Sequence, residues 1–262
     1  MKKIIKKILQ KMMSQRPVVI VENLVDKGDE FHNKRTIVFG GGTGIGKAIA
    51  EKLLASGSQV IVCGRKNHDI KGAINEIWDV SDIDNIPINF QRLVKKYGQI
   101  DIVVNSQGIL THSDFFDVTP EEFENIFKTN IESLFFISQE VIKYFLDNEI
   151  RGHVLNICST EGLKGTITPY GLSKASAVRI TQGLGKAFAS KNIVVNGIAP
   201  GATATSMMRQ KDRQNWAPPY NIPSGRMCTA TEIGNLARFL LSDASNQMCG
   251  EVIVMDGGES LH

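Results

Sequence analysis

The chain has few of the residues that mark metal centres, disulfide frameworks or membrane spans. Its 262 residues include four cysteines and five histidines. No two cysteines have the C-x-x-C spacing and the histidines are scattered, so we expect reduced thiols and no structural or catalytic metal. No apolar run approaches the ~20 residues that a membrane-spanning helix needs. These absences favour a reduced, cytoplasmic globular protein.

Acidic residues are missing from one stretch, residues 1–16, which carries six basic residues. Apolar residues there recur on one helical face, which predicts a basic amphipathic helix over residues 1–13. Attachment to an anionic membrane surface is one interpretation, and packing on the body or on a second subunit is the other. Without these six, residues 17–262 have 24 basic and 27 acidic residues. This part of the chain is therefore mildly acidic, which argues against nucleic-acid binding. We divide the chain into an N-terminal extension, residues 1–33, and an NAD(P)-binding catalytic domain, residues 34–262.

The clearest local motif is a glycine-rich turn between a predicted strand and a predicted helix. The strand covers residues 36–39, the turn reads Gly-Gly-Gly-Thr-Gly-Ile-Gly over residues 40–46, and the helix covers residues 47–56. A second apolar strand, residues 59–63, completes a β-α-β unit. Glycines let the backbone approach a pyrophosphate, and the helix N-terminus offers it free N–H groups. The predicted dinucleotide contacts are Gly40, Thr43, Gly44, Ile45 and Gly46.

The end of the second strand predicts which dinucleotide is bound. A carboxylate there would hold the 2′-hydroxyl of NAD and repel the 2′-phosphate of NADP. Here Gly64 and Arg65 follow the strand without an acid, and a guanidinium is a good partner for a phosphate. We therefore expect NADP(H) in preference to NAD(H). Residues 66–78 are too few for a full crossover helix and the next strand, so we expect an abbreviated helix or a loop.

Strands and helices alternate along the remaining chain, about seven of each. This predicts an α/β protein, a single doubly wound Rossmann domain with a parallel sheet of about seven strands. In such a sheet the carboxyl ends of the strands meet in one crevice. Asp79, Asn105, Ser159 and Pro200 all follow predicted strands, so we expect them to converge there with the glycine turn. Residues 203–224 show little periodicity and are expected to form a lid over the crevice.

Tyr170 and Lys174 lie four residues apart on a helix that Thr168 and Pro169 are expected to begin. This spacing places both side chains on one helical face. A phenol in water has a pKa of ~10, and a nearby ammonium favours its ionised form. Such a pair can give and take a proton in carbonyl or alcohol chemistry. A surface tyrosine beside a surface lysine is the alternative, and the glycine turn and Ser159 argue against it.

Together these motifs resemble the one-domain branch of the short-chain dehydrogenase/reductase family, over roughly residues 36–258. The turn is similar to the family's T-G-x-x-x-G-x-G, with Phe39 in place of Thr. Residues 105–108 are similar to N-N-A-G, and residues 200–205 to P-G-x-x-x-T. The resemblance implies a catalytic set of Ser159, Tyr170, Lys174 and Asn130. The implied cofactor contacts, beyond the glycine turn, are Gly64, Arg65, Asp79, Val80, Asn105, Gly108, Tyr170, Lys174, Pro200, Gly201, Thr203 and Thr205.

The expected activity is hydride transfer between NADP(H) and a small ketone or secondary alcohol, of the carbonyl reductase type. The resemblance implies that Ser159 hydrogen-bonds the carbonyl oxygen, Tyr170 exchanges the proton and Lys174 holds the ribose. Asn130 would hold a water that links Lys174 to solvent, and the alternative is a polar residue bonded locally within its helix.

Two rival functions stand beside this one, a catalytically silent dinucleotide-binding sensor and a membrane-recruited assembly protein. The first normally requires a lost catalytic group, whereas Ser159, Tyr170 and Lys174 are all present. Small residues on the Tyr170 helix, together with the habit of the family, favour a homodimer or homotetramer.

Overall fold

The computed structural model describes residues 30–208 and 221–261. Within these ranges one seven-stranded parallel sheet has the order β3-β2-β1-β4-β5-β6-β7. The predicted doubly wound Rossmann domain is confirmed. The strands are β1 (Arg35–Phe39), β2 (Gln59–Gly64), β3 (Ile74–Ile77), β4 (Ile102–Asn105), β5 (His153–Ile157), β6 (Val194–Pro200) and β7 (Val252–Met255).

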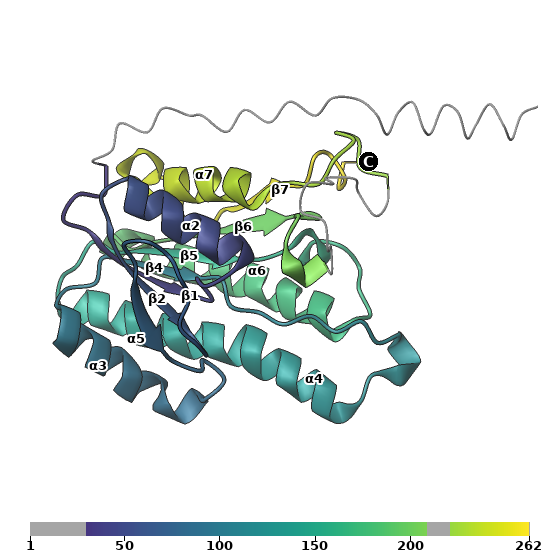
Figure 1. Cartoon of the computed structure of the whole chain (residues 1–262), viewed down its shortest axis with the longest axis horizontal. Helices are drawn as coiled ribbons and strands as arrows, with labels where there is room; N and C mark the ends of the chain where they lie inside the picture. The colour runs from purple at the N-terminus through teal and green to yellow at the C-terminus, as the bar shows by residue number, and fades with distance from the viewer. Residues whose placement is uncertain (1–29, 209–220, 262) are drawn as a thin grey trace, which may run out of the picture.

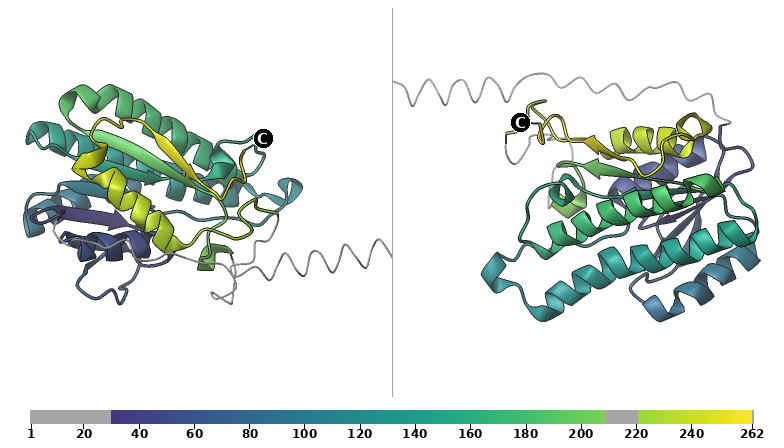
Figure 2. Two further views of the ribbon diagram at one scale, coloured as in Figure 1. Left: turned by 90° about the horizontal axis from the view of Figure 1, so that it is seen from above. Right: turned by 180° about the vertical axis from the view of Figure 1, so that it is seen from behind.

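Helices cover both faces of the sheet (Figure 1). Two of them pack against each other over one face, α2 (Gly44–Ala55) and α7 (Ala230–Leu241). The opposite face carries α3 (Ile86–Tyr97), α4 (Pro120–Phe127), α5 (Ser133–Asp147) and α6 (Pro169–Phe188), as the view from behind in Figure 2 shows. Short 3-10 turns are η1 (Ile83–Asn85), η2 (Phe115–Asp117), η4 (Thr160–Gly162), η5 (Ala189–Lys191), η6 (Ser206–Met208) and η7 (Asp243–Ser245).

Two hydrophobic cores lie on either side of the sheet. In β1, Ile37 and Phe39 face the core that contains Phe145 of α5, whereas Val38 faces the core that contains Leu53 of α2. Burying one such side chain stabilises the fold by about 1.5–3 kcal/mol. Because both faces are covered, the strands are nearly continuous apolar runs without polar alternation.

The connection from β2 to β3, residues 65–73, contains no helix. Parallel strands are usually joined by a helical crossover of a dozen or more residues. Here Ile70 and Phe31 fill part of the space, and both are buried in the core that α2 covers. The predicted shortening of this crossover is confirmed.

An ion-pair network fixes the edge strand β3 to α3. The buried carboxylate of Glu76 accepts hydrogen bonds from Arg92 at 2.8 Å, Lys96 at 2.7 Å and Tyr97 at 2.5 Å. Burial alone would raise the pKa of Glu76, but the hydrogen bonds from its partners outweigh it and hold that pKa at about 2. The strand beside the crossover is therefore held by charge as well as by backbone pairing.

A continuous helical segment runs from Pro120 to Asp147, and within it a π turn, Lys128–Glu132, separates α4 from α5. Thr119 caps the start of this segment, because its hydroxyl accepts from the N–H of Glu122. Asn130 lies within the π turn. Such turns are rare and are frequent at functional sites.

Two predicted elements fall wholly or mostly outside the described ranges, and a third feature, the N-terminal extension, ends inside them. The basic helix over residues 1–13 and most of the lid over residues 203–224 lie outside them. No helix within residues 30–208 and 221–261 is long and apolar enough to cross a membrane. At the end of the predicted extension, Phe31 is 2% exposed and Glu30 pairs with Arg238 at 2.8 Å, so the chain is packed on the body from Glu30 onward.

Candidate active site

The glycine turn between β1 and α2 has the shape of a phosphate cradle. Gly40 and Gly44 have φ of +69° and +54°, a region that favours glycine. A Cβ on Gly46 would lie 2.3 Å from the carbonyl oxygen of Gly40, so only glycine lets α2 begin this close to β1. Thr43, the N-cap, makes no side-chain capping bond, and the first turn, which includes Ile45, has no acidic residue. The N–H groups there remain available to an anion, which fits a dinucleotide pyrophosphate.

Two distant segments meet this turn. A Cβ on Gly40 would lie within 2.8 Å of the backbone of Ser106 and Gln107, which follow β4. A Cβ on Gly44 would lie 3.4 Å from the methyl group of Thr205, which follows β6. Segments predicted to bind one cofactor from three parts of the sequence therefore lie together at the carboxyl edge of the sheet.

Tyr170 and Lys174 lie together in the first turns of α6. Thr168 caps this helix by accepting from the N–H of Gly171 at 3.0 Å, and Pro169 is its first residue. The Lys174 ammonium lies 5.7 Å from the centroid of the Tyr170 ring. It is buried and donates to the carbonyl of Ile157 at 2.8 Å, which fixes it at the end of β5. The shared helical face expected from the spacing is present.

Ser159 lies at the same strand end, two residues after the carbonyl that holds Lys174. It is 8% exposed and begins the short turn η4. Its Oγ accepts from the N–H of Glu161 at 3.2 Å, so the hydroxyl hydrogen remains available for another acceptor. Glu161 itself is exposed and lies 3.6 Å from Lys164.

Asn130 joins the loop after β4 to α6. Its Oδ1 accepts from the N–H of Ile109 at 2.8 Å, and its Nδ2 donates to the Ile109 carbonyl and to Ser173 Oγ, both at 3.0 Å. The locally bonded alternative is thereby excluded for its side chain. A Cβ on Gly108 would lie 3.4 Å from Asn130 Oδ1 and 3.6 Å from Lys174 Nζ. Gly108 thus lies between the π turn and the Tyr–Lys pair.

Buried polar atoms remain without partners at the cofactor edge. Asn105 donates to Asn156 at 2.9 Å, but its Oδ1 has no hydrogen-bond partner among the described residues. Gln107 donates to Ser133 at 3.1 Å, and its Oε1 is equally unpartnered within those residues. Buried acceptors of this kind normally have a donor, and a polar ligand at this edge would supply one.

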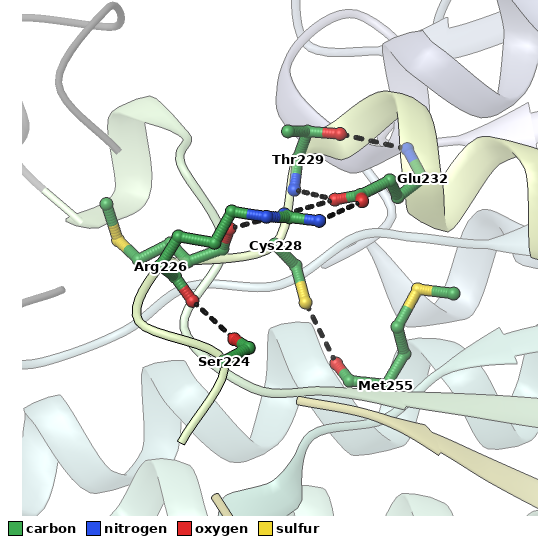
Figure 3. Close-up of polar contacts among 7 residues, drawn as sticks. Ser224, Arg226, Cys228, Thr229, Glu232 and Met255 are labelled. Atoms are coloured by element: carbon green, nitrogen blue, oxygen red, sulfur yellow. Dashed lines mark hydrogen bonds and ion pairs between the residues drawn. The ribbon is translucent and has the colours of Figure 1, made fainter. Parts of the chain in front are cut away.

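The segment after β6 is held in place on both sides of the residues 209–220. Gly201 lies against Asp256, and the hydroxyl of Thr203 donates to the Gly201 carbonyl. The backbones of Thr203 and Cys228 form an isolated parallel β-bridge. Pro200 ends β6 directly before them. Figure 3 shows the second anchor, where Arg226 pairs with Glu232 at 2.8 Å within the N-terminal capping box of α7. Both ends of the predicted lid are therefore tied to the sheet or to α7.

The adenosine end of the predicted site is more open. Gly64 ends β2, and Arg65 after it is exposed. The Asp79 carboxylate accepts from the N–H and the hydroxyl of Ser81, whereas Val80 is 8% exposed within the core. The contacts of Arg65, Asp79 and Val80 with a cofactor remain predictions.

Comparison with known proteins places this geometry in a family. A profile described as enoyl-(acyl carrier protein) reductase matches residues 40–260. The 3-oxoacyl-[acyl-carrier-protein] reductase FabG of Chlamydia muridarum is 33% identical over 86% of this chain and 97% of that protein. FabG of Escherichia coli is 30% identical over 87% and 98%. The crystal structure of a short-chain type dehydrogenase/reductase from Mycobacterium marinum has 28% identity and a TM-score of 0.81, over 92% of this chain and 100% of that one.

The chain belongs to the short-chain dehydrogenase/reductase family. As a member of this family it is an NAD(P)-dependent oxidoreductase that acts on CH–OH groups or the corresponding carbonyls. The aldohexose dehydrogenase AldT of Thermoplasma acidophilum covers 89% of this chain and 96% of its own with a TM-score of 0.82, and at 22% identity it adds a likeness of fold alone.

Several residues of this dehydrogenase site have no signal in the sequence. Ser173 and the backbone of Ile109 hold Asn130, and Asn156 holds Asn105. Each contact joins residues at least 21 positions apart, so no local spacing could have predicted it. The contact of His68, in the short crossover, with the glycine turn also joins residues that are distant in sequence, so local spacing could not predict it.

Proposed function

We propose that this enzyme reduces the ketone of a 3-oxoacyl thioester, or a comparable small ketone, to a secondary alcohol with NADPH. The observation that carries the proposal is the Lys174 ammonium, held by the carbonyl of Ile157 beside the Tyr170 ring and two residues from Ser159. The names of relatives that match nearly their whole length support the substrate class.

The side chains have complementary roles in this proposal. When bound, the reduced nicotinamide would supply hydride to a carbonyl carbon, and negative charge would then grow on the carbonyl oxygen. Ser159 donates its free hydroxyl hydrogen to that oxygen. Tyr170 donates the proton, and the Lys174 charge stabilises the phenolate that remains. Asn130, beside Gly108 and Lys174, holds the water through which the proton is replaced.

The proposed preference for NADP(H) depends on the end of β2. Arg65 and Lys66 are exposed there, and no acid follows the strand directly. The nearby acid Glu76 is buried among cations of α3, and Asp79 is bonded to Ser81. Comparison of kcat/KM for NADPH and NADH tests this preference, and a higher value for NADH would contradict it.

Substrate class is tested by following NADPH absorbance with three kinds of compound. These are an acetoacetyl thioester, a trans-2-enoyl thioester and a simple ketone. We expect turnover of the 3-oxo thioester, because Ser159 and Tyr170 offer their hydrogens to an oxygen. Reduction of the enoyl thioester alone would favour the activity in the family profile's description and contradict the proposal.

The variant Tyr170→Phe tests the role of Tyr170 as the proton donor. Loss of its hydroxyl is expected to lower kcat by roughly 100-fold or more, the usual scale for a general acid, with Kd for NADPH within about twofold. A variant that turns over at near the wild-type rate would contradict the assignment of Tyr170. The rival predictions, a silent sensor and an assembly protein, are not favoured by the family membership.

We also propose a homodimer or homotetramer. Apolar side chains remain exposed on two neighbouring helices, Phe135 at 45% and Phe136 at 37% on α5 and Leu172 at 40% on α6. Light scattering after size exclusion tests the assembly, and a monomer at micromolar concentration would contradict it. Membrane contact through residues 1–16 and the cytoplasmic location stay predictions.

A further inference from the structure

The helix-free crossover between β2 and β3 is a loop held in place by hydrogen bonds and by a buried side chain. The N–H of His68 donates to the side chain of Asn75 on β3 at 2.9 Å. The next turn closes when the N–H of Ile70 donates to the His68 carbonyl at 3.1 Å. Ile70 is 5% exposed in the core that α2 covers. Anchors on both sides of His68 therefore fix where its side chain begins.

The His68 imidazole lies directly against the glycine turn. A Cβ on Gly42 would lie 2.0 Å from its Cδ2 and 2.1 Å from its Nε2. A Cβ on Gly64, at the end of β2, would lie 3.8 Å from the same Nε2. The ring thus spans the gap between the turn after β1 and the end of β2. It can lie there only because position 42 has no side chain.

Neither imidazole nitrogen makes a hydrogen bond to any residue within 30–208 and 221–261, although His68 is half-buried. The gap that it spans is where a doubly wound fold receives the adenosine ribose of a dinucleotide, beyond the end of the second strand. Arg65 starts the same loop. An imidazole N–H and a guanidinium are both suited to donate to phosphate oxygens.

We propose that His68 is a specificity-determining residue of this enzyme, which donates a hydrogen bond to the ribose 2′-phosphate of NADP(H) from the loop that Arg65 begins. The inference builds on the proposed preference for NADP(H). This role would explain the short crossover, since a loop without a helix brings His68 back over the glycine turn. Gly42 leaves room for the imidazole in that turn, because it has no side chain.

The test is binding of two cofactor fragments that lack nicotinamide, measured by titration calorimetry. The probes are 2′,5′-ADP, which carries the 2′-phosphate, and 5′-AMP, which differs from it only in lacking that phosphate. For His68→Ala we expect Kd for 2′,5′-ADP to rise roughly tenfold or more, as for a lost hydrogen bond to a charged group. Kd for 5′-AMP should stay unchanged. His68→Gln keeps an N–H donor on this loop and is expected to recover part of the loss.

The matched control is His32→Ala, the same substitution at an exposed position before β1, at the amino end of the strands. It should alter neither Kd. Gly42→Ala places a methyl group where the ring lies, so it should weaken 2′,5′-ADP in the wild type and add nothing in His68→Ala. Melting temperatures of all variants show whether the fold is retained, and the loop position of His68 favours that.

Two results would overturn the inference. Unchanged binding of 2′,5′-ADP by His68→Ala would show that the imidazole makes no contact with the phosphate. An equal loss for both fragments would assign His68 to the base or to the 5′-phosphate. Failure of the underlying preference is separately visible, because the wild type would then bind both fragments equally. Failure of the proposed reduction appears only in the turnover assay.

Discussion

Asn130 offers a sharp test of the way the site is held together. Its amide makes three hydrogen bonds in a buried position, two to the backbone of Ile109 and one to Ser173. These bonds tie the loop after β4 to the helix that carries Tyr170 and Lys174. Asn130→Ala removes all three and leaves buried donors and acceptors without partners.

The expected cost follows from the count of bonds. At roughly 1 kcal/mol for each buried hydrogen bond, the variant should lose about 3 kcal/mol of unfolding free energy. For a chain of this size that corresponds to a fall in Tm of about 6–12 °C. kcat should fall as well, because the loop beside Gly108 and Lys174 loses its anchor. Asn130→Asp puts a buried carboxylate oxygen against the Ile109 carbonyl oxygen, which cannot donate to it, so this variant should lose at least as much stability as Asn130→Ala.

The control is a buried polar residue further along the same helical segment. Ser138 on α5 is 1% exposed, and its hydroxyl has no hydrogen-bond partner among the described residues. Ser138→Ala should therefore leave Tm unchanged or raise it, since no bond is lost. Thermal unfolding followed by circular dichroism measures both variants. If Asn130→Ala melted within 2 °C of Ser138→Ala, the three bonds would carry no stability and the reasoning would fail.

Two further predictions concern elements beside the site. The pKa of Glu76, about 2 against an ordinary 4.5, means that its stabilisation is complete above pH 4.5 and lost as the pH falls towards 2. Glu76→Gln should lower the free energy of unfolding, measured by urea titration, by at most about 3 kcal/mol at pH 7 and by clearly less at pH 3, whereas a difference independent of pH would contradict the assignment. Gly46→Ala should lower both Tm and affinity for NADPH, because its Cβ would lie 2.3 Å from the Gly40 carbonyl. Gly183→Ala on α6, which meets nothing within 4 Å, should raise Tm slightly, and equal melting of the two variants would refute the steric argument.

The parts of the fold that could be predicted from sequence are those encoded by local pattern. Continuous apolar runs identify strands covered on both faces, and their alternation with helices requires a parallel sheet. The Tyr170–Lys174 spacing needs only a helix, and Thr168 and Pro169 mark its start. A carboxyl edge that collects strand ends then follows from the topology alone.

The remaining features depend on contacts between distant residues. A π turn at Lys128–Glu132 looks like ordinary helix in sequence, because its residues have no distinct propensity. Asn130 finds its partners 21 and 43 positions away, so its bonds can be seen only in the folded chain. The position of His68 depends equally on Asn75, whose side chain fixes the loop.

The two halves of the crevice are built in different ways, and this has a consequence for specificity. In the reacting half, Lys174 is held by a strand carbonyl and Ser159 caps a turn at the same strand end, so a shift of either would disturb the parallel sheet. In the adenosine half, His68 and Arg65 belong to a loop between β2 and the edge strand β3, where other lengths and residues are tolerated. Cofactor preference can therefore change through residues 65–73 while proton transfer at Tyr170 stays intact.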